Sequence, residues 1–112
     1  MSNDAINVSS PREGLAFVEF CGEHDLATKE ETGALLERLV AENGRVVVDL
    51  CSATFIDSSI LSCLLAAHRS AAEHDHELRI LVEDNPAITA VLRVSGVNKH
   101  LVVVTTRDQA FA

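Results

Sequence analysis

Short apolar runs alternate along the chain with longer segments in which apolar residues recur every three or four positions. Runs typical of buried strands lie at Leu15–Cys21, Arg45–Leu50, Leu78–Val82 and Leu101–Val104. A short edge strand is expected at Ile6–Val8, and the turn-forming residues of Ser10–Gly14 predict a hairpin that joins it to the next strand. The first run is followed by Gly22, so we expect a loop at Glu23–Asp25.

The intervening segments carry the signals of helices. Thr28–Glu31 has the form of a capping box, and a stripe of Leu and Val after it predicts a helix that ends at Gly44. A second helix is expected to begin at Asp57-Ser58-Ser59. Its apolar positions cover more than half of its circumference, which predicts a well-buried helix.

Two further helices complete the pattern. Asn85 is the expected N-cap of the third, with Pro86 at its first position and Ser95-Gly96 at its end. Thr106–Gln109 predicts the start of a short C-terminal helix.

The alternation of strands and helices defines the fold class. It predicts an α/β fold: a mixed, mostly parallel β-sheet with an N-terminal hairpin and about four helices packed against it. The 112 residues suit one domain, and residues 1–5 are polar enough that we expect them to be disordered.

Composition narrows the class of partner. Seventeen acidic and nine basic side chains give a formal charge of −8, and Trp and Tyr are absent. Such a surface repels phosphate backbones and anionic lipids, so nucleic acid is excluded and a basic protein surface is favoured. With no signal peptide and no membrane-length apolar run, the chain is expected to be cytoplasmic, without direct membrane insertion.

Metal and cofactor chemistry has little support in the sequence. Cys21, Cys51 and Cys63 show no C-x-x-C spacing, so buried reduced thiols are expected. His74-Asp75-His76 lacks a third ligand at a useful spacing, and no metal site is predicted. The chain has neither a P-loop nor G-x-G-x-x-G, and no cofactor is expected.

The segment Phe55–Leu61 is the most informative for function, because an apolar run ends at Asp57 and helical periodicity begins at once. The amides and dipole of a helix start favour negative charge, so a phosphate on Ser58 is expected to sit against those amides without melting the fold. Together with Asp25 and Asp57, it would repel an acidic or apolar partner. The alternative is that Asp57 and Ser58 only cap the helix.

Four motifs occur in order: Gly22–Asp25 after a strand, Val46–Leu50, Phe55–Ser59 and Ser95–Val97. On these motifs, the chain from about Leu15 onward resembles the STAS domain family, and within it the bacterial anti-sigma-factor antagonists. The resemblance implies an interaction with an anti-sigma factor that is also a serine kinase and that brings its own ATP and Mg²⁺. Binding would release a sigma factor, phosphorylation of Ser58 would end it, and a serine phosphatase would restore it.

The resemblance also implies a set of partner contacts. We expect them at Glu23, Asp25, Asp57, Ser59 and Ile60. Ile60 departs from the family, which commonly has Gly at this place. A β-branched side chain in the first helical turn could obstruct a close approach or serve a different partner.

Two other functions remain as alternatives. One is a scaffold or transporter-associated STAS subunit that does not switch, in a stress-signalling or lipid-transport complex. The other is a hydrolase with Ser58 as nucleophile, which is disfavoured because the strained turn of G-x-S-x-G is absent. The chain is therefore not expected to be an enzyme.

Overall fold

The computed structural model describes residues 4–112 and contains a mixed sheet with four α-helices. The strands are β1 (Ala5–Arg12), β2 (Leu15–His24), β3 (Arg45–Asp49), β4 (Ala53–Ile56), β5 (Glu77–Leu81) and β6 (Val102–Val104). The helices are α1 (Lys29–Glu42), α2 (Ser58–Glu73), α3 (Pro86–Ser95) and α4 (Arg107–Phe111). Short 3₁₀ turns lie at η1 (Leu26–Thr28) and η2 (Val97–Lys99). This architecture confirms the predicted fold class.

The sheet has the order β1-β2-β3-β5-β6 and is parallel except for the β1–β2 hairpin. Strand β2 is longer than β3. Its first half pairs with β3, whereas its last residues, Gly22–His24, pair in parallel with β4. Because β4 runs straight into α2, this pairing brings the end of β2 beside the start of that helix.

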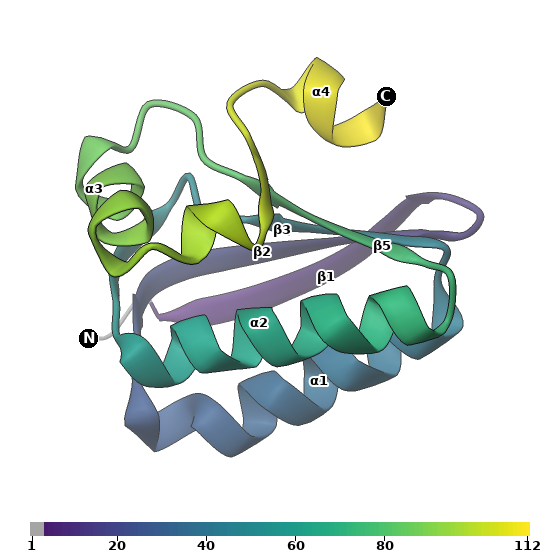
Figure 1. The fold of residues 1–112 in the computed structure, drawn as a ribbon, viewed down its shortest axis with the longest axis horizontal. Coiled ribbons are helices and arrows are strands. Elements are labelled where there is room, and N and C mark those ends of the chain that lie inside the picture. The colour runs from purple at the N-terminus through teal and green to yellow at the C-terminus, as the bar shows by residue number, and fades with distance from the viewer. Residues whose placement is uncertain (1–3) are drawn as a thin grey trace.

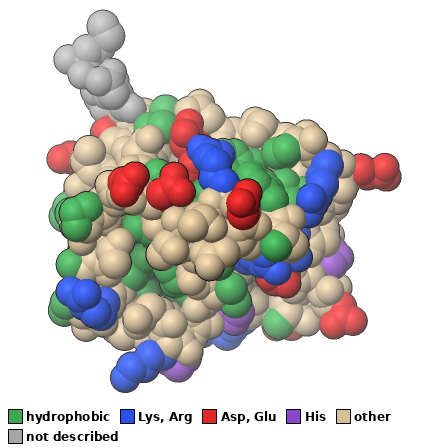
Figure 2. Space-filling view, turned by 90° about the horizontal axis from the view of Figure 1, so that it is seen from above, with side chains coloured by type: hydrophobic (Ala, Val, Ile, Leu, Met, Phe, Trp, Pro, Cys, Tyr) green, Lys and Arg blue, Asp and Glu red, His purple; other side chains and the backbone are tan. Residues whose placement is uncertain are grey.

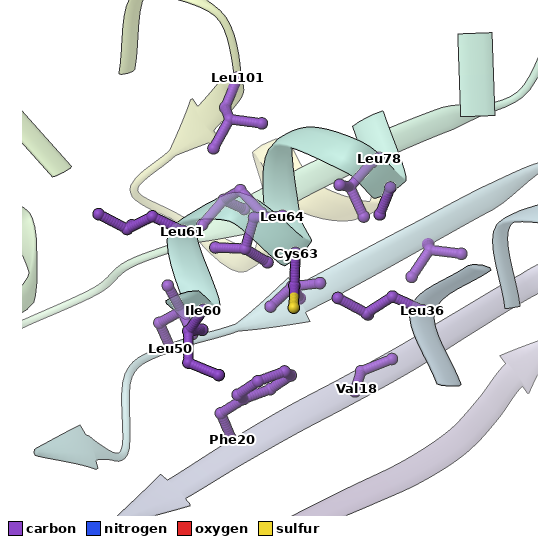
Figure 3. Close-up of a cluster of buried hydrophobic side chains, with 14 of the residues drawn as sticks. Val18, Phe20, Leu36, Leu50, Ile60, Leu61, Cys63, Leu64, Leu78 and Leu101 are labelled. Atoms are coloured by element: carbon purple, nitrogen blue, oxygen red, sulfur yellow. The ribbon is translucent and has the colours of Figure 1, made fainter. Parts of the chain in front are cut away.

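The helices cover the two faces of the sheet unequally. Helices α1 and α2 lie side by side against one face, α3 lies toward one end, and α4 lies on the opposite face (Figure 1). The main core fills the space between the sheet and α1, α2 and α3. It includes Val18, Phe20, Leu36, Leu50, Ile60 and Leu64, all of them fully buried (Figure 3). The strong burial expected for α2 is confirmed, because six of its residues are buried.

Helix α4 is attached to the second face by both apolar and polar contacts. The Phe111 ring lies 5.6 Å from that of Phe17, and Arg107 forms an ion pair with the buried Asp49 at 3.6 Å. Arg79 donates to the carbonyl oxygen of Gln109 at 2.5 Å. Acidic and basic side chains are interspersed on this side of the molecule (Figure 2).

Several boundaries differ from the sequence prediction. Strand β1 begins at Ala5 and continues to Arg12, so the turn is confined to Glu13-Gly14. Residue 5 is therefore ordered, while residues 1–3 of the segment predicted to be disordered lie outside the described residues. Glu23 and His24 belong to β2 and not to a loop, because β4 pairs with them. Gly22 has a φ of 82°, which permits the irregularity in that pairing.

Two smaller expectations are also wrong. The Thr28 side chain does not cap α1; Asp25 instead caps η1 through the amide of Ala27 at 3.0 Å. Cys63 is buried as expected, whereas Cys21 and Cys51 are only half-buried. Burial nevertheless raises the pKa of the Cys51 thiol to about 11, so that it stays protonated at neutral pH. The capping box Thr106–Gln109 is confirmed.

The side chain of Asn85 fixes the turn between β3 and β4. Its Nδ2 donates to the carbonyl oxygens of Leu50 and Ala53 at 2.9 and 2.8 Å, and its Oδ1 accepts from the amide of Ile88 at 3.3 Å. The residue thus caps α3, as predicted, and also holds the segment that leads into α2.

We expect Asn85→Ala to lower the free energy of unfolding by about 2–4 kcal/mol, because it removes a helix cap and leaves carbonyl groups unpaired. Urea denaturation measures this change. Asn43→Ala is the matched control, since that side chain makes a single bond, to the Leu39 carbonyl, and should cost about 1 kcal/mol. Equal losses in the two variants would contradict this role of Asn85.

Candidate functional site

The site lies where the ends of β2 and β4 meet the start of α2. His24 pairs with Ile56 across the two strands, so the residues that follow each strand emerge next to each other. The amide of Leu26 donates to Asp57 Oδ2 at 3.1 Å, which joins η1 directly to the N-cap of α2. The fold therefore brings together two acidic segments, 23–25 and 57–59, that are more than thirty residues apart in the chain.

Asp57 is the N-cap of α2 and holds most of the hydrogen bonds at this site. Its Oδ1 accepts from the amides of Ser59 and Ile60 at 3.0 and 3.2 Å and from the Ser59 hydroxyl at 2.5 Å. The capping role considered for Asp57 is thus present.

These bonds stabilise the ionised carboxylate. The hydroxyl of Ser59 is the largest cause that lowers the pKa of Asp57, and the amides of Ile60, Leu26 and Ser59 add to it, while burial acts in the opposite direction. Asp57 therefore carries its negative charge throughout the neutral pH range.

Ser58 is exposed at the first position of α2, and its hydroxyl makes no hydrogen bond with any other described residue. Its carbonyl oxygen accepts from the Ser62 hydroxyl at 3.0 Å within the helix. The Ser58 side chain is thus exposed and not held by a hydrogen bond to another described residue. Ser59 differs, because it is half-buried and its hydroxyl is engaged with Asp57.

A phosphate on Ser58 was expected to sit against the amides of the helix start. Two of these amides, those of Ser59 and Ile60, donate to Asp57 Oδ1. A phosphate on Ser58 would therefore share the helix start with the Asp57 carboxylate, and two negatively charged groups would lie close together there.

Ile60 does not lie on the surface. Its side chain is fully buried and lies near Leu50 and Phe20 (Figure 3). The expectation that Ile60 contacts or obstructs a partner is wrong, because α2 turns this position toward the sheet. The bulk of Ile60 fills the core beneath the helix start instead.

The other expected contacts are at the surface to different degrees. Glu23 is exposed, and its amide donates to Asp4 Oδ1 at 2.8 Å. Asp25 is half-buried, with one carboxylate oxygen engaged in the cap of η1. Both residues belong to the segment that the β2–β4 pairing and the Leu26–Asp57 bond bring beside the start of α2.

Two exposed apolar residues near Ser58 were missed from the sequence. Leu26 in η1 is 70% exposed and Phe55 in β4 is 48% exposed. Phe55 belongs to an apolar run, but in β4 both Thr54 and Phe55 are exposed, and only Ala53 and Ile56 at the two ends of the strand are buried. The presence of Leu26 in an acidic turn was the one available signal.

Comparison with known proteins defines the class. Residues 15–105 match the family model described as "Mlab, STAS domain", and the chain belongs to the STAS domain family. No curated protein is matched by the sequence.

Solved structures share the fold with this chain, and three of them show the degree of similarity. An anti-sigma factor antagonist from Mycobacterium paratuberculosis has a TM-score of 0.82 at 22% identity, with 98% of this chain and 94% of that chain covered. Unphosphorylated SpoIIAA, an anti-sigma factor antagonist, has a TM-score of 0.73 at 14% identity, with coverages of 94% and 92%. Phosphorylated SpoIIAA of Bacillus, described as a cell fate determinant, has a TM-score of 0.70 at 17% identity, with 96% of each chain covered.

The lowered pKa of Asp57 predicts a pH dependence of stability. Because the folded-state pKa is below that of the unfolded chain, the contribution of Asp57 is complete above the ordinary value of 3.8 and is lost as the pH falls through the folded-state pKa. We expect wild type to lose more unfolding free energy between pH 6 and pH 2.5 than Asp57→Asn, which retains a cap without the charge. Urea denaturation across this range measures both, and identical losses would contradict the prediction.

Proposed function

We propose that this chain is an anti-sigma-factor antagonist that works by partner switching. It binds a cognate anti-sigma factor that is also a serine kinase, and so releases a sigma factor in the cytoplasm. Phosphorylation of Ser58, with ATP and Mg²⁺ supplied by the kinase, ends the interaction, and a serine phosphatase restores it. The observation that supports this most directly is the exposed side chain of Ser58, next to an Asp57 carboxylate that is held by the amides of Ser59 and Ile60.

The apolar residues around Ser58 suit the unphosphorylated state. Leu26 and Phe55 expose large side chains on the two segments that meet at the helix start, and burial of such side chains against a partner is favourable. Docking also requires the charge of Asp57 to be matched by a basic group. A partner surface with apolar pockets and a positive rim would meet both conditions.

Phosphorylation of Ser58 would make this docking unfavourable. It adds about −1.5 to −2 charges at neutral pH, next to Asp57 and close to Asp25. A strongly hydrated dianion then stands among the apolar contacts and must lose its water before the partner can dock. Because Ser58 is exposed and points away from the core, the folded state bears little of this cost.

In this mechanism the chemistry belongs to the partners. Hydrolysis by Ser58 would need a base, and the histidine nearest in the fold is unsuited: His24 is buried, and its Nε2 donates to the carbonyl of Cys21 at 2.8 Å. Ser58 is thus a substrate of the kinase and not a nucleophile of this chain.

A second candidate function is that of a STAS subunit that does not switch, in a transport or stress-signalling assembly. The description of the matching family model, "Mlab, STAS domain", names no anti-sigma factor, and this favours a STAS subunit outside partner switching. In that case Ser58 stays unmodified and the same surface docks another subunit. Co-purification with membrane ATPase components, without phosphate on Ser58, would support this function over partner switching.

Phosphorylation is tested by incubating the protein with the cognate kinase and ATP and recording intact masses. Wild type should gain one phosphate, and Ser58→Ala none, because the neighbouring Ser59 hydroxyl is held by Asp57. Ser59→Ala is the matched control and should still be phosphorylated. A phosphate that appears on Ser58→Ala would remove Ser58 from the mechanism.

The docking surface is tested by apolar truncation. Phe55→Ala should weaken binding to the anti-sigma factor about tenfold or more in titration calorimetry, with less than about 1 kcal/mol lost in stability, because half of the ring is already exposed.

Val8→Ala is the control, since Val8 is 46% exposed but lies opposite Val18, about 20 Å along β2 from the His24–Ile56 pair. If the control weakened binding as much as Phe55→Ala, the docking surface would lie elsewhere.

A further inference from the structure

A cavity with a volume of about 530 Å³ lies on the side of η1 between the beginnings of β1 and α1 and the end of β2. Ile6, Ala27 and Leu35 contribute apolar wall. The volume is within the range of small-ligand pockets. This cavity is distinct from the exposed start of α2, although it shares Glu23 and Asp25 with the acidic surface described above.

Two buried side chains that line the cavity each have one polar atom without a hydrogen-bond partner among the described residues. His24 is 2% exposed and Thr32 is fully buried, and neither His24 Nδ1 nor Thr32 Oγ1 has a hydrogen-bond partner among the described residues. Buried polar groups are normally paired, because an unpaired group forfeits its hydration. Their presence in one cavity points to a ligand that completes them.

The kind of ligand depends on which ring nitrogen of His24 carries a hydrogen. Its Nε2 lies 2.8 Å from the carbonyl oxygen of Cys21, which can only accept, so Nε2 carries the hydrogen. In the neutral ring Nδ1 is then an acceptor. The hydroxyl of Thr32 accepts as well as donates. Both unpaired atoms can therefore accept a hydrogen bond from a donor in the cavity.

The rim of the cavity also carries hydrogen-bond acceptors. Carboxylates of Asp4, Glu23, Asp25 and Glu31 line the cavity, and no Lys or Arg is present among the described lining residues. The carboxylate of Asp4 accepts from the amide of Glu23, and that of Asp25 accepts from the amide of Ala27. The side chains of Glu23 and Glu31 are exposed. Convergent negative charge around a cleft concentrates cations there.

We propose that this cavity binds a guanidinium group. A guanidinium presents five N–H donors in one plane and carries the positive charge that the rim lacks. Its donors would serve His24 Nδ1, Thr32 Oγ1 and the rim carboxylates, while its aliphatic stem lies along Ile6 and Leu35. The group belongs either to a small organic cation or to an arginine side chain of a docking protein. The proposal does not depend on phosphorylation of Ser58.

The test is an NMR titration of the full chain with two probes at matched ionic strength: agmatine, and the peptide acetyl-Gly-Arg-Gly-amide. Saturable shifts of the His24 ring nitrogens and of the Thr32 amide are expected. Tighter binding of agmatine identifies a small cation as the source, and tighter binding of the peptide identifies a protein side chain. If neither probe gives a saturable shift at His24, the proposal is overturned.

Two substitutions distinguish binding in this cavity from non-specific attraction of a cation to an acidic protein. Glu31→Gln should weaken binding of the better probe about tenfold, the loss expected for one charge-assisted hydrogen bond. Glu42→Gln, an exposed residue at the other end of the same helix, should change it less than about twofold. Equal effects of the two substitutions would overturn the proposal.

Thr32→Val gives a second and independent readout. The substitution removes an unpaired hydroxyl with little change of shape, so the melting temperature of the ligand-free protein should not fall. Affinity for the probe should nevertheless decrease. This combination distinguishes a binding role from a structural one, whereas unchanged affinity in a folded Thr32→Val protein would overturn the assignment.

Discussion

The carboxylate of Asp57 is the interaction on which the site depends. It joins two segments that are distant in the sequence, because one oxygen caps α2 through Ser59 and Ile60 and the other accepts from the amide of Leu26 in η1. The connection fixes the direction in which α2 leaves β4. Ser58 is held outward as a result, while Ile60, two residues later, is buried in the core.

This arrangement separates stability from recognition. The residues that stabilise the helix start lie beneath or beside Ser58, and the hydroxyl itself takes no part in the described hydrogen bonds. An added charge can therefore alter the surface without breaking a native contact. The acidic cavity beyond η1 shows the opposite situation, because there the unpaired groups of His24 and Thr32 reduce stability and are explained by binding.

Much of the fold could be predicted from the sequence because local signals agreed with one another. The predicted runs Arg45–Leu50 and Leu78–Val82 contain the buried strands β3 (Arg45–Asp49) and β5 (Glu77–Leu81). Asp57, Asn85 and Thr106 cap α2, α3 and α4. The errors arose where a distant segment decides the local structure. Glu23 and His24 are strand residues only because β4 pairs with them. Thr28 does not cap α1 with its side chain, because the turn η1, capped by Asp25, directly precedes that helix.

The site was predictable in outline and not in its contacts. The order Asp57-Ser58 after an apolar run indicated a helix start, but the capture of its amides by Asp57 depends on geometry. Whether Phe55 is exposed and Ile60 buried depends on which side of β4 and of α2 faces the core. The sequence pattern over so few residues does not determine this. The cavity brings His24 and Thr32 together across two elements, and no motif signals that contact.

The most direct test of the central claim measures stability and binding on one sample of the protein phosphorylated at Ser58. Urea unfolding gives its free energy of unfolding, and titration with the anti-sigma factor gives its affinity, each beside the unmodified protein. The account predicts a stability within about 1 kcal/mol of the unmodified protein and an affinity at least about tenfold lower. A phosphorylated protein that unfolds much more readily, or that binds as tightly as before, would contradict it.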